Sequence, residues 1–136
     1  MYLNKLRIVI ADDNPRVLRQ FISLLALDFQ IVGTAENGKS ALECIRLQRP
    51  DVVILDLQMP VLNGIDVTLE LKRFTPSPAV VICSVETDSE FVQAALQAGA
   101  VCYVFKIRMA SDLVAAVNSA ARRETFISTQ QVQRSR

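Results

Sequence analysis

The chain has 136 residues, of which 51% are hydrophobic and 21% charged, as is typical of one domain with a hydrophobic core. Fifteen basic and fourteen acidic residues nearly balance, so the domain as a whole carries no charge signature of a nucleic-acid or membrane-surface partner. Histidine is absent, which excludes a Ser-His-Asp triad and histidine-ligated zinc within these residues. The apolar runs are too short to span a bilayer and no signal-peptide pattern opens the chain, so we expect a cytoplasmic protein.

Apolar runs alternate with amphipathic stretches from the first residues onward. Five runs have the length and composition of β-strands: residues 6–11, 30–35, 51–55, 79–83 and 101–105. A helical pattern follows each of them: residues 15–27, 40–47, a segment ending near 74, 89–98 and 110–123. Asn14 and Pro15 have the pattern of an N-cap and first residue of the first helix, and Gly99 that of a residue ending the fourth.

Five strand–helix units with short connections predict an α/β fold with a doubly wound parallel sheet covered by helices on both faces. The third strand is continuously apolar after Asp51, as expected for a strand buried on both faces. Residues 1–123 are therefore expected to form one domain. Residues 124–136 are polar and lack a helical apolar stripe, so we expect a linker or a frayed end there.

Cysteine chemistry contributes little to this sequence. Cys44, Cys83 and Cys102 form no CxxC pair, and two of them lie within apolar runs, which favours buried free thiols.

Polar residues follow four of the five predicted strands. They are Asp12 and Asp13, Asp56, Ser84, and Lys106. Because the carboxyl ends of parallel strands share one edge of a sheet, we expect these side chains to converge there. Each residue alone has an ordinary interpretation, as a helix cap, a turn residue or a surface lysine. The presence of all five at one edge of the sheet is what favours a functional site.

Three crowded carboxylates repel one another unless a cation offsets their charge, and oxygen ligands without histidine favour Mg²⁺. A metal ion beside an aspartate, with a lysine and a hydroxyl opposite, suits phosphoryl transfer to the carboxylate.

The motifs around these residues resemble those of bacterial two-component response-regulator receiver domains. Residues 8–14 resemble the family's acidic pocket motif, and residues 51–60 with Gly64 its phosphoacceptor segment. Three further matches are the strand-four hydroxyl Ser84, the switch aromatic Tyr103 and the strand-five lysine Lys106. The resemblance covers residues 5–121 and implies a flavodoxin-like (CheY-like) sheet of five strands in the order 2-1-3-4-5 with five helices.

The resemblance implies a role for each matched residue. Asp56 would take a phosphoryl group from a sensor histidine kinase. Asp13, Asp56 and the backbone carbonyl of Gln58 would ligate Mg²⁺ directly, with Asp12 acting through bound water. Lys106 would pair with the phosphate.

Two of the matched residues would form the switch. Ser84 would swing toward a phosphate oxygen and Tyr103 would rotate inward, which would reshape the face of helix four, strand five and helix five. The plainer interpretation of Tyr103 is a half-buried strand aromatic. Val85, Cys102 and Ile107 depart from the family pattern, at positions that bear on the switching geometry and the dephosphorylation rate.

The last third of the chain narrows the subfamily. Residues 103–106, 112–117 and 125–128 are similar to receivers of the NarL/FixJ (LuxR-type) group, which usually carry a DNA-binding helix-turn-helix and control transcription. No such module lies within this chain, so DNA contact is expected only through a module absent from it, and a homodimer is a further partner. Whether the chain is a stand-alone receiver or part of a longer regulator stays open.

Two rival functions remain. A phosphohydrolase of the haloacid dehalogenase type needs a second aspartate two residues after the nucleophile, where this chain has Gln58, and no room is left for a cap domain. Neither GxxxxGK(S/T) nor GxGxxG occurs, which argues against a nucleotide-binding module. A receiver-like interaction module that needs no phosphate is the second rival, and the complete set of pocket residues argues against it. We expect a regulatory phosphoacceptor and not a turnover enzyme.

Overall fold

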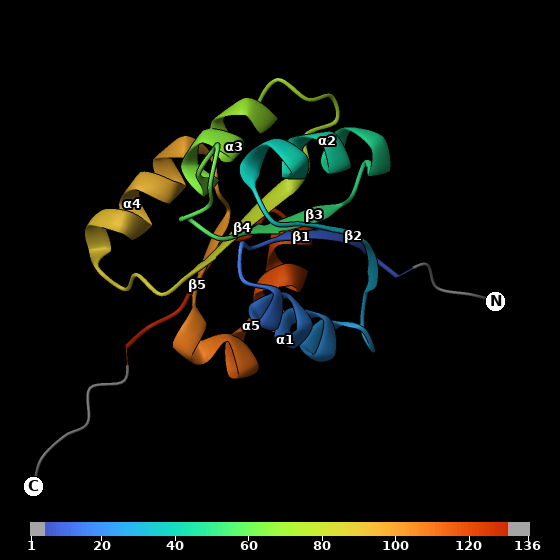
Figure 1. Ribbon diagram of the computed structural model, residues 1–136. Coiled ribbons are helices and arrows are strands. Elements are labelled where there is room, and N and C mark those ends of the chain that lie inside the picture. Colours follow the sequence, from blue (N-terminus) through green and yellow to red (C-terminus); the bar gives the residue numbers. More distant parts are fainter. Residues whose placement is uncertain (1–4, 131–136) are drawn as a thin grey trace, which may run out of the picture.

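A parallel sheet runs through the centre of the protein, with helices on both sides of it (Figure 1). The structure is a computed structural model that describes residues 5–130. Its strands lie in the order β2-β1-β3-β4-β5-β6, and every neighbouring pair is parallel. The strands are β1 (Arg7–Ala11), β2 (Gln30–Ala35), β3 (Val52–Leu55), β4 (Ala79–Ser84), β5 (Cys102–Phe105) and β6 (Phe126–Ile127). The doubly wound flavodoxin-like sheet and the order of its first five strands are thus confirmed.

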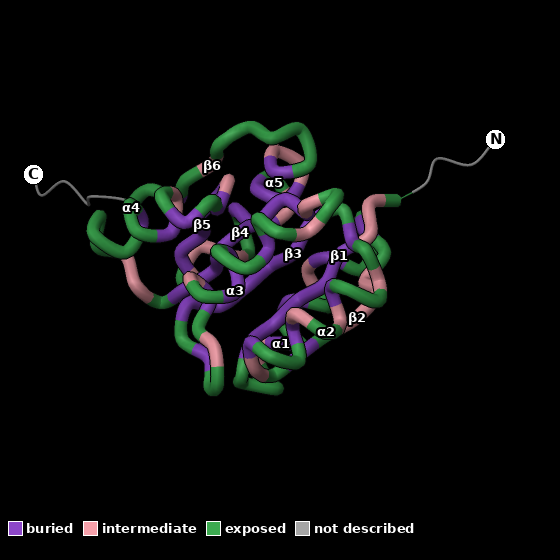
Figure 2. The backbone as a smooth tube through the Cα atoms, turned by 90° about the horizontal axis from the view of Figure 1, so that it is seen from above, coloured by how far each residue is buried: buried purple, intermediate pink, exposed green. Residues whose placement is uncertain are grey.

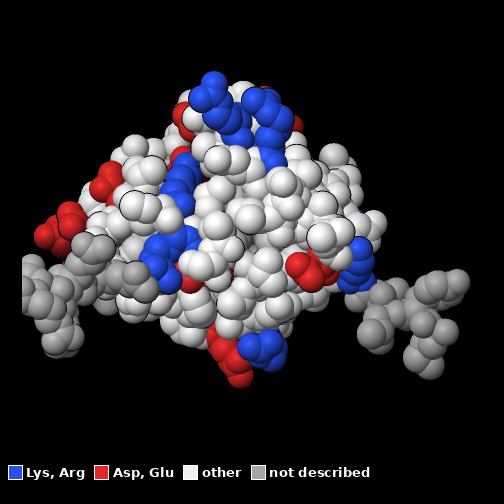
Figure 3. Space-filling model, turned by 90° about the horizontal axis from the view of Figure 1, so that it is seen from below, with Lys and Arg blue, Asp and Glu red and all other residues white. Residues whose placement is uncertain are grey.

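Five α-helices cover the sheet: α1 (Pro15–Leu25), α2 (Gly38–Gln48), α3 (Gly64–Leu71), α4 (Ser89–Ala98) and α5 (Met109–Ala121). A short 3-10 helix, η1 (Lys106–Arg108), links β5 to α5. Helices α1 and α5 lie on one face of the sheet, and α2, α3 and α4 on the other (Figure 1). Seen from the side of α1 and α5, the middle of the surface carries few charged side chains, which lie toward its margins (Figure 3).

The hydrophobic core is divided by the sheet into two layers. Successive strand residues point to opposite faces, so Ile8 and Ile10 pack under α1 and α5, whereas Val9 and Ala11 pack under α2. All residues of β3 and β4 are buried, as Figure 2 shows for the centre of the sheet, which agrees with the apolar sequence of these strands up to Ser84, the last residue of β4.

Local signals in the sequence set several helix ends. The Asn14 side chain accepts hydrogen bonds from the backbone N–H groups of Arg16 and Val17, and Pro15 is the first residue of α1, as predicted. Gly99 ends α4 with φ +121°, a conformation that residues with a Cβ rarely adopt. The third helix stops at Leu71, three residues before the predicted end, and a turn follows it.

Part of the segment expected to be a linker or frayed end forms a strand. Phe126–Ile127 forms a sixth strand parallel to β5, with Cys102 opposite Phe126. The edge of β5 would otherwise leave backbone hydrogen-bonding groups without partners, and Phe126 packs against the core, so a two-residue strand is enough to close this edge. Residues 131–136, the remainder of the predicted tail, lie outside the described residues.

The three thiols are free, and Cys83 and Cys102 are buried while Cys44 is half-buried. Burial raises the pKa of each thiol. No helix within residues 5–130 has the length and apolar character needed to cross a bilayer.

Candidate functional site

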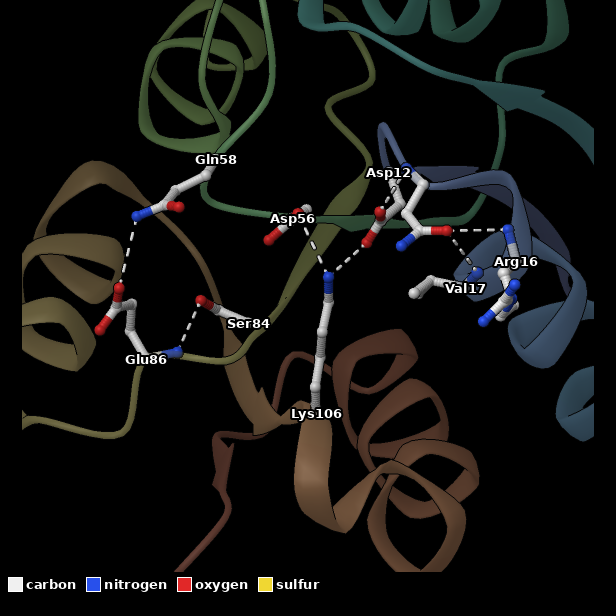
Figure 4. A network of polar contacts seen from close by, with 9 residues as sticks. Asp12, Arg16, Val17, Asp56, Gln58, Ser84, Glu86 and Lys106 are labelled. Carbon is white, nitrogen blue, oxygen red and sulfur yellow. Dashed lines mark hydrogen bonds and ion pairs between the residues drawn. The ribbon is translucent and has the colours of Figure 1, made fainter.

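The carboxyl ends of β1, β3, β4 and β5 meet at one edge of the sheet, and the predicted polar residues gather there (Figure 4). Asp12 and Asp13 follow β1, Asp56 follows β3, Ser84 ends β4, and Lys106 begins η1 directly after β5. Residues separated by as many as ninety-four positions in the chain therefore converge because the strands are parallel and adjacent.

Lys106 is the centre of this group. Its ammonium Nζ lies 2.6 Å from Asp12 Oδ2 and 3.2 Å from Asp56 Oδ2, between the two carboxylates. Asp12 is fully buried, and its other oxygen accepts a hydrogen bond of 2.9 Å from the backbone N–H of Asn14. The side chain of Asp56 is 9% exposed, so it is the carboxylate of the Lys106 pair that a molecule in solution can reach.

Burial and neighbouring charges act together on these groups. Burial raises the pKa of Asp56, the Lys106 charge opposes this rise, and the Asp12 charge adds to it. For Lys106, burial acts to lower the pKa, but the hydrogen bonds and charges of Asp12 and Asp56 outweigh it, so the pKa lies above its ordinary value. The lysine therefore stays positively charged next to the carboxylates.

An acidic cluster suited to a metal ion lies in the same place. Carboxylate oxygens of Asp12, Asp13 and Asp56 lie within 4.8 Å of one another. Lys106 supplies one positive charge against three negative ones, so the cluster retains net negative charge. A hard cation with oxygen ligands, of which Mg²⁺ is the common example, fits both this charge and this donor set.

Ser84 and Tyr103 are linked through one residue that the sequence did not suggest. The Ser84 hydroxyl is buried and accepts a hydrogen bond of 3.0 Å from the backbone N–H of Glu86, while the Tyr103 hydroxyl donates one of 2.8 Å to the Glu86 carbonyl. Tyr103 is fully buried, so it already lies inward and is not half-buried. Burial raises the pKa of its hydroxyl to about 12, which keeps it protonated as a donor.

Gln58 lies at the mouth of the site. Its side-chain amide donates a hydrogen bond of 3.3 Å to the Glu86 carboxylate, and both residues lie on the far side of Asp56 from Asp12 (Figure 4). The residues that depart from the family pattern differ in their surroundings, since Val85 and Ile107 are 66% and 89% exposed whereas Cys102 is buried in the core.

Comparison with known proteins agrees with this arrangement. Residues 8–118 match the family model of the response regulator receiver domain. The chain belongs to the response-regulator receiver family. Two curated receiver-containing relatives are the transcriptional regulatory protein DegU of Brevibacillus brevis and the nitrate/nitrite response regulator protein NarL of Escherichia coli.

DegU is 32% identical over 126 residues, which make up 91% of this chain and 53% of that protein. NarL is 36% identical over 124 residues, or 89% of this chain and 57% of that protein. The solved receiver domain of NarL from Mycobacterium tuberculosis superposes with a TM-score of 0.84 at 31% identity, covering 88% of this chain and 98% of that domain. The receiver is thus of the NarL/LuxR type, and it spans about half the length of the curated relatives it matches.

Proposed function

We propose that this receiver accepts a phosphoryl group on Asp56 from a phosphohistidine of a sensor histidine kinase. The observation that supports it is the position of Asp56, which is the one carboxylate, among the described residues, that both pairs with Lys106 and retains an exposed surface. Asp12 is fully buried beside the same lysine, and Asp13 is exposed without such a contact, so neither combines the two properties.

The residues present support a specific division of roles in the transfer. An Asp56 oxygen attacks the phosphorus, the phosphorus–nitrogen bond breaks, and its electron pair leaves with the kinase imidazole. Lys106 stabilises the negative oxygens of the transferred group. Asp13, Asp56 and the Gln58 carbonyl would hold Mg²⁺ directly and Asp12 would hold it through water, and the bound ion would supply further neutralising charge.

The output of the switch is proposed on the same basis. To reach a phosphoryl oxygen, the Ser84 hydroxyl must release the Glu86 N–H, and Tyr103 holds the carbonyl of the same residue, so the two side chains are coupled through Glu86. The affected face is formed by α4, β5 and α5. We propose that this face controls transcription through a further module and that the protein works in the cytoplasm.

We also propose that the protein pairs with a second copy of itself. The surface of α1 and α5, whose middle carries few charged side chains, is the candidate contact for this pairing (Figure 3).

A regulatory acceptor fits the site better than a turnover enzyme. The position two residues after Asp56 is an amide, Gln58, which donates a hydrogen bond to Glu86 and does not gain or lose a proton near neutral pH, so it cannot serve as a general acid or base. The phosphorylated Asp56 is therefore proposed to persist until water or a partner removes the group.

Intact-mass spectrometry after incubation with a small phosphodonor and Mg²⁺ tests the proposal. We expect one added phosphoryl group on the wild type and none on Asp56→Asn. Asp51→Asn is the matched control, because Asp51 lies at the opposite end of β3, and it should label normally. Failure to label the wild type, even with a cognate kinase, would favour an interaction module that needs no phosphate. Steady release of phosphate from many donors per protein would favour a hydrolase.

A further inference from the structure

Two buried polar side chains have no part in the site described above. Among the described residues six polar or charged side chains are buried, and three of them belong to that site. A fourth, Thr68, bonds within its own helix to the Gly64 carbonyl. The remaining two, Asp112 on α5 and Ser128 directly after β6, bond to each other across the sheet edge, with their hydroxyl and carboxylate oxygens 2.7 Å apart.

Ser128 attaches its segment to the rest of the domain by three hydrogen bonds, two to β5 and one to α5. Its hydroxyl donates to Asp112 and accepts from the backbone N–H of Phe105 at 3.1 Å, and its own backbone N–H donates to the Tyr103 carbonyl at 2.9 Å. Ser128 is only 3% exposed, so loss of its hydroxyl would leave the buried Phe105 N–H without this partner and would remove one of the bonds to the Asp112 carboxylate. Further along, the Gln130 amide donates to the Thr87 hydroxyl in the β4–α4 loop.

These contacts flank Lys106 on both sides. Phe105, which donates to Ser128, directly precedes the lysine, and Arg108, two residues after it, pairs with Asp112 at 3.1 Å. Helix α5 begins without a side-chain cap at Arg108, and its first turn is fastened to η1 by the Arg108–Asp112 pair together with a hydrogen bond of 3.0 Å from the Ser111 hydroxyl to the Arg108 carbonyl. The turn that carries Lys106 is thus held at both ends by one polar cluster, defined by Arg108, Asp112 and Ser128.

We propose that Asp112 and Ser128 are positioning residues that hold Lys106 toward Asp12, and that a phosphoryl group on Asp56 loosens residues 126–130 from β5. The proposal rests on the phosphoacceptor role of Asp56. A phosphoryl group draws Lys106 away from Asp12 and attracts Arg108, which lines the adjacent groove with Val85 and Ile107. Both movements pull on the cluster that docks the segment after α5.

Coupling between the phosphoacceptor Asp56 and the polar cluster must act in both directions. Binding of a phosphoryl mimic therefore distinguishes this coupling from a contact that only stabilises the fold. If phosphorylation loosens the cluster, then weakening the cluster must favour the phosphorylated state. A residue that only stabilises the fold would lower the melting temperature without tightening the binding of a phosphoryl mimic.

Hydrogen exchange measured by mass spectrometry on the wild-type chain is the first test. With Mg²⁺ and beryllofluoride, the amides of residues 126–130 should exchange faster by roughly fivefold or more, the lower end of ordinary couplings between sites. Unchanged or slower exchange there would overturn the proposal. A wild-type chain that neither labels nor binds beryllofluoride would remove both proposals, whereas one that labels without a change in exchange would remove only this one.

Variants of Ser128 supply the reciprocal test. Ser128→Ala should bind beryllofluoride roughly fivefold more tightly in a titration followed by NMR. Ser128→Thr, which keeps the hydroxyl, should behave like the wild type, and so should Thr129→Ala, a change at the exposed neighbouring residue. Unchanged or weaker binding by a folded Ser128→Ala would contradict the proposal.

Discussion

Replacing Asp13 by asparagine is expected to stabilise the metal-free protein while removing its response to Mg²⁺. The three carboxylates lie within 4.8 Å of one another. At that separation two negative charges repel by about 1 kcal/mol in water and about 3.5 kcal/mol at an effective dielectric constant of about 20. Asp13 is exposed and Lys106 offsets part of the charge, so we expect a gain near the lower figure. For a domain of this size a gain of about 1 kcal/mol raises Tm by roughly 3–5 °C.

Thermal unfolding followed by circular dichroism, first with a chelator and then with increasing Mg²⁺, measures both effects. A ligand that binds only the folded state stabilises it by about 2.7 kcal/mol at one hundred times its Kd, so Mg²⁺ should raise the Tm of the wild type clearly and that of Asp13→Asn much less. Asp28→Asn, at an exposed position outside the site, should match the wild type. The reasoning is refuted if Asp13→Asn melts below the wild type without metal, or if Mg²⁺ stabilises both equally.

Three further changes test other parts of the structure. Gly64→Ala would place a methyl group 2.3 Å from the Asp56 carbonyl oxygen, a backbone atom, so it should destabilise by about 1–3 kcal/mol and slow labelling by a phosphodonor. Tyr103→Phe loses the buried bond to the Glu86 carbonyl, and denaturant unfolding should show a loss of about 1 kcal/mol. Burial raises the pKa of Asp112, but bonds from two hydroxyls and a guanidinium outweigh this and hold it below its ordinary 3.8. The ionised Asp112 carboxylate therefore stabilises the fold above pH 3.8, and this stabilisation is lost as the pH falls through the lower pKa of the folded state. The difference in free energy of unfolding between the wild type and Asp112→Asn should accordingly become smaller in acid.

The glycine substitution has a matched control, and each of the three predictions has an outcome that would contradict it. Gly33→Ala clashes with the Cys44 side chain away from the site, so it should destabilise the fold yet label at the normal rate. Equal labelling of the two glycine variants would contradict the first prediction. No loss in Tyr103→Phe, or a gap for Asp112→Asn that stays constant down to the acid transition, would contradict the other two.

The sequence contains most of what positions the site. The buried strands are recognisable because β3 and the first five residues of β4 are apolar, and Asp56 and Ser84 are recognisable because they end those runs. Parallel pairing then brings Asp12, Asp56 and Lys106 to one edge without any knowledge of side-chain packing.

The details that the sequence did not predict depend on single contacts. Glu86 gives no pattern, because its role is a backbone N–H and carbonyl that happen to face Ser84 and Tyr103. Strand β6 offers only two apolar residues, which is too short for a period of two to stand out. The burial of Ser128 follows from that strand, so it could not be inferred before the strand was seen.

The direction of β6 also decides at which edge of the sheet a fluorophore on the last described residues would lie. Because β6 runs parallel to β5, the chain leaves the sheet at the edge where Asp56 lies, and Gln130 already contacts the β4–α4 loop. The chain enters β1 at the opposite edge (Figure 1). A fluorophore attached at residue 130 would therefore lie at the edge of the sheet that carries Asp56, whereas one attached at residue 5 would lie at the opposite edge and serve as the distant reference.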